Sequence, residues 1–152
     1  MLSQKAKYGI RALMYLCQKG EGKPVLIREI AENEHLPKKF LEVILLELKS
    51  AGILHSRPGR GGGYTLNRAP KTITVGRVLR LIDGPLALIP CVSQTAYAPC
   101  KDCPDEKICG IRAVMKQVRD ATSKVLDETT LADLIEHQDR LSRSNSALDF
   151  TI

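Results

Sequence analysis

Apolar residues recur at helical spacing in three segments of the first half of the chain. Residues 3–20 begin with a suitable N-cap, and their apolar face is formed by Ile10, Leu13, Met14, Leu16 and Cys17. Residues 27–34 predict a short second helix. Residues 37–52 predict a third helix, with Pro37 in its first turn and Gly52 at its end, which buries Leu41, Ile44, Leu45 and Leu48. Two helices joined by so tight a connection predict a helix-turn-helix.

The segment ILHSRPGRGGGYTL follows directly and has the pattern of a hairpin. Residues 53–56 and 64–66 predict two short strands, and the prolines and glycines between them exclude regular structure there. Arg57 and Arg60 would project from this hairpin. A plain flexible turn would also use these glycines, but the position just after a helix-turn-helix favours the wing of a winged helix.

Three further helical patterns occupy the second half. Thr74 would cap a helix over residues 75–83, and Thr130 would cap a final helix with the sequence LADLIEHQ. Between them, residues 111–128 carry a narrow stripe formed by Ile111, Val114, Met115, Val118, Ala121 and Val125. Such a stripe packs either on its own domain or on a second copy, and the small size of the protein favours a homodimer. Residues 139–152 show no clear period, and we expect a flexible tail.

These patterns predict a mainly α fold with a small β-hairpin wing, a winged helix-turn-helix followed by a long dimerisation helix. The expected parts are a DNA-binding domain (1–83), a cysteine-rich loop (84–110), the dimerisation and final helices (111–138) and the tail (139–152). No apolar run is long enough for a membrane helix, and no secretory signal precedes the first helix, so we expect a cytoplasmic protein.

The net charge of +6 is unevenly distributed along the chain. Residues 1–80 hold 15 Lys and Arg against 6 Glu, whereas residues 81–152 hold 8 basic against 11 acidic residues. A basic N-terminal half is either a solvated surface or a binding surface for a polyanion, most simply nucleic acid. Aromatic residues make up only 4%, which argues against a stacking platform for single strands.

Four cysteines lie within nineteen residues with the spacing C-x8-C-x2-C-x5-C: Cys91, Cys100, Cys103 and Cys109. The loop also contains Pro90, Pro99 and Pro104, so the chain turns sharply and the thiols can converge on one metal or cluster. Iron–sulfur ligation, a reversible Cys100–Cys103 disulfide and a zinc site all remain open at this point. No nucleophile stands at a recognisable spacing from a base, and the glycine run lacks the Lys-Ser/Thr of a phosphate loop, so we expect no enzyme.

The order of these motifs resembles the Rrf-two family of bacterial transcriptional regulators. The resemblance spans about residues 1–137 and rests on KAKYGIRALMYL, LPKKFLEVILLELKSAGIL, RPGRGGGYTL, ITVGRVLRLID and the cysteine loop. It implies a winged-helix homodimer, and several family members bind an iron–sulfur cluster through three cysteines in this loop. Cys103 and Cys109 keep the family's spacing, and Cys91 stands where the first ligand would be.

The fourth ligand departs from the family's pattern. Where some members have a histidine after the last cysteine, this chain has Arg112, and residues 5–8 lack the acidic residue that others use. The resemblance therefore implies that Cys100 substitutes as the fourth ligand, of either a 2Fe–2S or a 4Fe–4S cluster.

The resulting hypothesis is a homodimeric regulator that binds a palindromic operator in double-stranded DNA and whose affinity is controlled by an iron–sulfur cluster. Lys38, Lys39 and Glu42 would read the major groove, and Arg57 and Arg60 would contact the minor groove. Two alternatives are a metal-free regulator of the same fold, controlled by thiol oxidation or a partner protein, and an iron–sulfur electron carrier.

Overall fold

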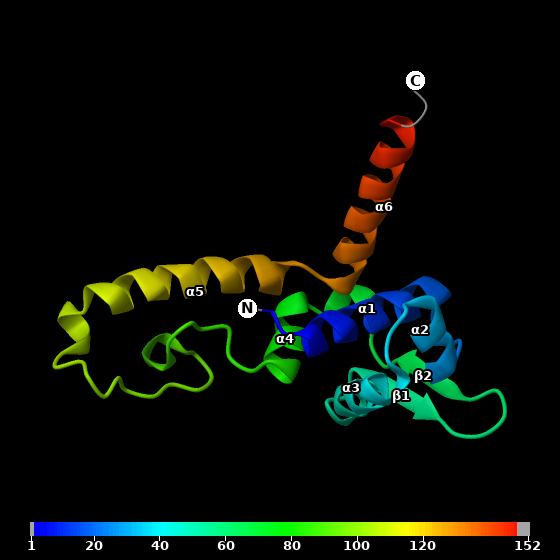
Figure 1. Cartoon of the computed structure of the whole chain (residues 1–152), viewed down its shortest axis with the longest axis horizontal. Helices are drawn as coiled ribbons and strands as arrows, with labels where there is room; N and C mark the ends of the chain where they lie inside the picture. Colours follow the sequence, from blue (N-terminus) through cyan, green and yellow to red (C-terminus); the bar gives the residue numbers. More distant parts are fainter. Residues whose placement is uncertain (1, 149–152) are drawn as a thin grey trace.

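A computed structural model of the protein describes residues 2–148, with side chains to Asn145. Figure 1 shows a body of short helices and a hairpin, from which two longer helices extend. In chain order the helices and strands are α1 (Gln4–Lys19), α2 (Ile27–Asn33), α3 (Lys38–Ser50), β1 (Leu54–Arg57), β2 (Gly63–Leu66), α4 (Val75–Ile82), α5 (Gly110–Glu128) and α6 (Leu131–Leu148). Short 3-10 turns occur at Pro70–Thr72, Pro90–Val92 and Glu106–Ile108. This is the expected mainly α winged helix-turn-helix fold.

The core forms where the apolar faces of α1, α2, α3 and α4 meet. The side chains predicted to face inward from α3 are all at most 1% exposed, and they pack with Leu13 of α1, Ile30 of α2 and Val78 of α4. Ile53, expected to begin a strand, is instead a fully buried core residue directly before β1. Burial of these side chains supplies the main driving force for the packing of short helices that would not be stable alone.

The predicted helix caps are confirmed. Ser3 Oγ accepts a hydrogen bond from the N–H of Ala6 at 2.9 Å, and Thr74 Oγ1 accepts one from Arg77 at 3.2 Å. Gly52 follows the end of α3 with φ +71°, a left-handed conformation that favours glycine. Pro37 differs slightly from the prediction, because it is the N-cap of α3 rather than a residue of its first turn.

The wing is anchored by a third segment that the sequence pattern did not reveal. β1 and β2 pair antiparallel, with Leu54 opposite Leu66 and Arg57 opposite Gly63. Val25, which precedes α2, exchanges two backbone hydrogen bonds with Tyr64, of 2.9 and 2.8 Å. The hairpin is therefore joined through β2, the strand that pairs with the one carrying Arg57, to the segment that precedes α2.

The prediction that the chain beyond residue 138 lacks structure is wrong for residues 139–148, because α6 continues to Leu148. Residues 149–152 lie outside the described residues. Polar side chains form hydrogen bonds along this helix. The hydroxyl groups of Ser142 and Ser144 donate to backbone carbonyl oxygens four residues earlier, and Arg140 Nη2 lies 2.8 Å from His137 Nδ1. Hydrophobic periodicity detects a helix that packs on a core, and this part of α6 projects away from the body (Figure 1). The division into domains at residues 83, 110 and 138 stays a prediction.

α5 runs beside the cysteine loop and joins the winged helix at its far end. Thr129, just after α5, accepts a hydrogen bond from the N–H of Val75 at 2.9 Å, and Leu131 donates to Ile73 at 2.9 Å. Both contacts fix the α5–α6 turn at the start of α4. Among the described residues, no helix combines the length and hydrophobicity needed to span a bilayer.

Candidate DNA-binding surface and cysteine site

The first turns of α3 present charged side chains to solvent. Lys38, Lys39 and Glu42 are all exposed, because the opposite face of the helix is the one buried in the core. Within residues 2–148 neither lysine forms an ion pair, although eight ion pairs stabilise other parts of the surface. These two positive charges at a helix N-terminus are thus available to an external anion.

Helical geometry distinguishes the residues that point most directly away from the core. Lys39, Val43 and Leu46 lie at i, i+4 and i+7 on the face opposite the buried stripe, whereas Glu42 lies to one side of them. The sequence analysis predicted DNA contacts for Lys39 and Glu42 and did not consider Val43 or Leu46, which are exposed on this face. The available signal was that both are apolar yet fall outside the buried helical period.

The wing carries its two arginines at different places. Arg57 is the last residue of β1, and Arg60 lies in the turn that joins the strands; both are exposed and, in the described part of the chain, lack an acidic partner. The turn needs glycine. A Cβ at Gly62 would lie 2.2 Å from the carbonyl oxygen of Arg57, and one at Gly63 would lie 2.4 Å from that of Val25. The glycine run therefore allows a tight turn that carries Arg60 and begins directly after Arg57.

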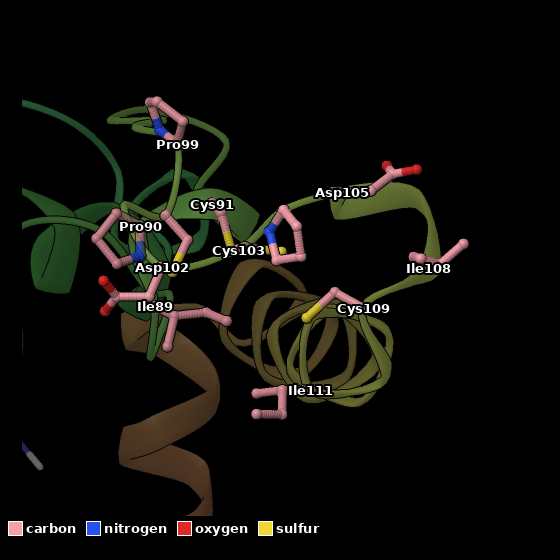
Figure 2. A pocket seen from close by; sticks show the side chains of 12 residues that line it. Ile89, Pro90, Cys91, Pro99, Asp102, Cys103, Asp105, Ile108, Cys109 and Ile111 are labelled. Atoms are coloured by element: carbon pink, nitrogen blue, oxygen red, sulfur yellow. The ribbon is translucent and has the colours of Figure 1, made fainter.

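All four loop cysteines line one pocket of about 530 Å³ between the loop and the start of α5. Cys91 is buried, Cys103 and Cys109 are half-buried, and Cys100 is exposed. Figure 2 shows Cys91, Cys103 and Cys109 arranged around the same hollow, with Ile89 and Ile111 at its border. The fold thus brings together the residues that the spacing singled out, over a distance of eighteen positions in the chain.

α5 positions two of these cysteines. Cys109 is its N-cap, and its sulfur accepts a hydrogen bond from the N–H of Arg112 at 3.4 Å. Cys91 lies in the 3-10 turn Pro90–Val92, which is held on α5 by Arg119, whose guanidinium donates to the carbonyl oxygen of Val92. Two parts of the pocket are consequently fixed to α5: Cys109 at its N-terminus and, through Arg119, the Cys91 turn near its middle.

The thiols of the pocket differ in acidity. The backbone N–H of Arg112 lowers the pKa of Cys109, as expected for a thiolate at a helix N-terminus. Burial raises the pKa of Cys103, and the hydrogen bond with Cys109 raises it further. Cys17 is separate from this site: burial against the core raises its pKa to about 11, in agreement with the structural role predicted for it.

The donor set suits an iron–sulfur cluster, but the ligand geometry is not preformed. Four sulfur donors share a pocket whose other members include the apolar side chains of Ile89, Ile108 and Ile111. Within the described residues, no three His, Cys, Asp or Glu side chains converge closely enough to hold a metal ion. The cysteines fit the chemistry of such a group, and a cluster would need them to draw closer together.

One face of α5 is apolar and exposed. Ile111, Val114, Val118 and Val125 are 69%, 53%, 38% and 63% exposed, and none contributes to the buried core. Met115 differs from the prediction that placed it in this stripe. It is half-buried on the neighbouring side of the helix, which it shares with Arg112 and Arg119. The exposed stripe is thus narrower than the sequence pattern indicated, and two of its members border hollows of the same chain: Ile111 lines the cysteine pocket, and Val118 lines a second pocket with Leu79 and Leu86.

Comparison with known proteins supplies the family. A family model described as "Rrf2: Iron-dependent Transcriptional regulator" matches residues 2–137, nearly the whole chain. The chain belongs to the Rrf2 (Rrf-two) family. It is 42% identical over 138 residues to an rrf2-like HTH-type transcriptional regulator of Rhodobacter capsulatus, a match that covers 89% of this chain and 92% of the relative.

Solved structures of Rrf2-family regulators share the fold. The structure of CymR, the global cysteine regulator of B. subtilis, superposes with a TM-score of 0.74 at 31% identity and covers 90% of this chain and 97% of that one. The structure of T. potens IscR gives a TM-score of 0.71 at 29% identity, with coverages of 91% and 88%. The protein is accordingly an Rrf2-family transcriptional regulator with a winged helix.

Proposed function

We propose that this Rrf2-family protein is a homodimeric regulator that binds a palindromic operator and whose affinity depends on an iron–sulfur cluster in the cysteine pocket. The observation that carries the proposal is the position of the four cysteines. They surround one pocket at the start of α5, and the other end of α5 is joined to the winged helix. A change in the pocket can therefore reach the DNA-binding surface through a single helix.

The DNA contacts follow from the geometry of α3 and the wing. Lys39 lies on the outermost face of α3, where side chains of a recognition helix meet base edges, and Lys38 lies beside it. Glu42 is placed to accept from a cytosine amino group. Arg57 and Arg60 extend from the hairpin toward the adjacent groove, where narrow A·T tracts attract cations.

A second copy of the chain would cover the exposed apolar stripe of α5. The exposed stripe of α5 offers apolar side chains at helical spacing that the described part of the chain leaves largely in contact with water. A two-fold axis along this stripe would pair identical faces and bury them from water. Two recognition helices related by such an axis would read the two halves of a palindrome.

The chain's own residues would couple the pocket to the helix. Cys91, Cys103 and Cys109 would hold the cluster, with Cys100 as the candidate fourth ligand, and the bound group would supply a centre that responds to oxidants or to iron supply. Cys109 is both a pocket thiol and the cap of α5, so ligation would act on the sulfur that accepts the hydrogen bond from the N–H of Arg112. Because Arg119 ties the Cys91 turn to the same helix, a shift of the loop acts on α5 at two points.

Anaerobic purification tests the cluster. The protein should be coloured, with iron and sulfide in near-equal amounts, and its operator affinity should change by about five- to 150-fold when the cluster is removed. The same treatment of a Cys91→Ser variant is the matched control, since it should change nothing in a protein that never held the cluster. Colourless wild-type protein with unchanged affinity would eliminate cluster control.

One observation favours a second candidate, control by thiol oxidation without metal. Interaction between the two thiols raises the pKa of Cys103 and lowers that of Cys109, and the backbone N–H of Arg112 at the start of α5 favours the thiolate of Cys109. A peroxide could oxidise this pair to a disulfide: the two thiols lose two electrons and two protons, and the peroxide is reduced to water or an alcohol. Mass spectrometry of iron-free protein distinguishes this route, because a Cys103–Cys109 disulfide makes the peptide about 2 Da lighter.

A further inference from the structure

The outward face of α3 carries apolar side chains that the protein core leaves unused. Val43 and Leu46 are 50% and 58% exposed, on successive turns of the helix. Both share their face with Lys39, opposite the side chains that pack into the core. Exposure of a valine and a leucine side by side leaves apolar area in water that a partner could cover.

The charges around this face narrow the chemistry of that partner. Lys39 shares this face, while Lys38 and Lys49 lie to one side of it together with Glu42. All three lysines are exposed, and among the described residues none of them has an acidic partner. A matching surface must present apolar groups and negative charges together. The major groove of DNA does so wherever thymine occurs, because the C5 methyl group lies on its floor and phosphates line its edges.

We propose that Val43 and Leu46 read thymine methyl groups in each half of the operator. This inference rests on the proposed DNA-binding function and adds the base that part of the site selects. An aliphatic side chain makes no hydrogen bond to any base edge, so it discriminates only through the methyl group that thymine alone carries. Glu42, beside this face, would supply the complementary preference for cytosine.

Deoxyuridine isolates the interaction, because it keeps every hydrogen-bonding group of thymine and lacks only the methyl group. Operators are first selected from random double-stranded DNA with the anaerobically purified full-length protein. Each conserved thymine of the selected site is then replaced by deoxyuridine. We expect substitution at a contacted thymine to weaken binding about fourfold in one half-site and about fifteenfold when made in both.

Two variants assign the contacts. Val43→Ala should abolish sensitivity to deoxyuridine at one thymine position and Leu46→Ala at another, with each variant keeping the sensitivity at the other's position. Both residues are exposed on a helix that the core holds in place, so the variants should fold. Leu141→Ala is the matched control: this leucine is 68% exposed on α6, and its loss should leave the whole pattern unchanged.

The outcomes distinguish failure of the proposed DNA-binding function from failure of thymine reading alone. If no sequence is enriched from random DNA, both the proposed function and this inference fail. If an operator is selected but deoxyuridine has no effect at any thymine, or if Val43→Ala and Leu46→Ala keep the wild-type pattern, thymine reading is wrong and operator binding stands.

Discussion

Arg80 of α4 and Asp127 of α5 form a two-pronged ion pair, with N–O distances of 2.6 and 2.8 Å between the two guanidinium nitrogens and the two carboxylate oxygens. Gly76 lies one turn before Arg80, and a Cβ there would be 2.1 Å from the Oδ1 atom of Asp127. The absence of a side chain at Gly76 is thus what lets the carboxylate reach Arg80. This contact joins the winged helix to the helix that carries the cysteine pocket.

Gly76→Ala should displace Asp127 and destabilise the joint between α4 and α5. Because the displaced atom is the end of an exposed side chain, we expect Gly76→Ala to lose the ion pair and to be less stable than Gly110→Ala by less than about 1 kcal/mol of unfolding free energy. Gly110→Ala is the matched control, because Gly110 begins α5 and a Cβ there would meet nothing within 4 Å. Urea unfolding measures both; equal stability of the two variants would contradict the close approach at Gly76.

The same ion pair predicts a pH dependence. Arg80 lowers the pKa of Asp127, so the native state favours the charged carboxylate and this stabilisation is present above the unfolded value of about 4. It is lost as the pH falls through the lower native value. Because Asp127 is 43% exposed, solvent screening limits the effect to less than about 1 kcal/mol. Asp127→Asn should therefore be less stable than the wild type at pH 7, and the difference should shrink below pH 4 in thermal unfolding.

Lys39 and Arg60 should contribute differently to DNA binding. If Lys39 reads bases, Lys39→Ala would cost about 1–3 kcal/mol on the selected operator and less on random DNA. Arg60→Ala should weaken binding to both and flatten the salt dependence, since a phosphate and groove contact releases counterions on any sequence. Titrations at several salt concentrations measure both effects. Equal losses for the two variants on every sequence would exclude base reading by Lys39.

The exposed stripe of α5 should be the dimer seam. Val114→Asp and Val118→Asp would bury charges in an apolar contact and should give monomers with poor operator affinity. Ala113→Asp introduces the same charge on an exposed position outside the stripe and should leave the dimer intact. Sedimentation of the three variants decides the assignment, and dimers in all three would refute it.

Cys100 tests whether the pocket uses three cysteines or four. If it is a ligand, Cys100→Ser should lower the anaerobic iron content as much as serine at Cys91, Cys103 or Cys109, because serine is a poor ligand at neutral pH. Cys109→Ser keeps an N-cap oxygen for α5, so its loss of iron would reflect ligation rather than a frayed helix. Full iron occupancy in Cys100→Ser alone would eliminate the four-cysteine model.

Local rules determined much of this protein from the sequence. The caps at Ser3 and Thr74, the buried period of α3 and the glycine turn of the wing each follow from contacts between near neighbours in the chain. The helix-turn-helix, the wing and the long α5 were therefore predictable to within a residue or two. The cysteine spacing likewise identified the four thiols that line the pocket.

Only the tertiary structure decided features that depend on residues distant in the chain. The pairing of Val25 with Tyr64 and the need for Gly76 beside Asp127 arise from segments brought together by packing. The same holds for α5, where Met115 is half-buried while Val114 and Val125 are exposed. The sequence period shows which side of a helix an apolar residue occupies, but the residues that bury it are determined by the fold.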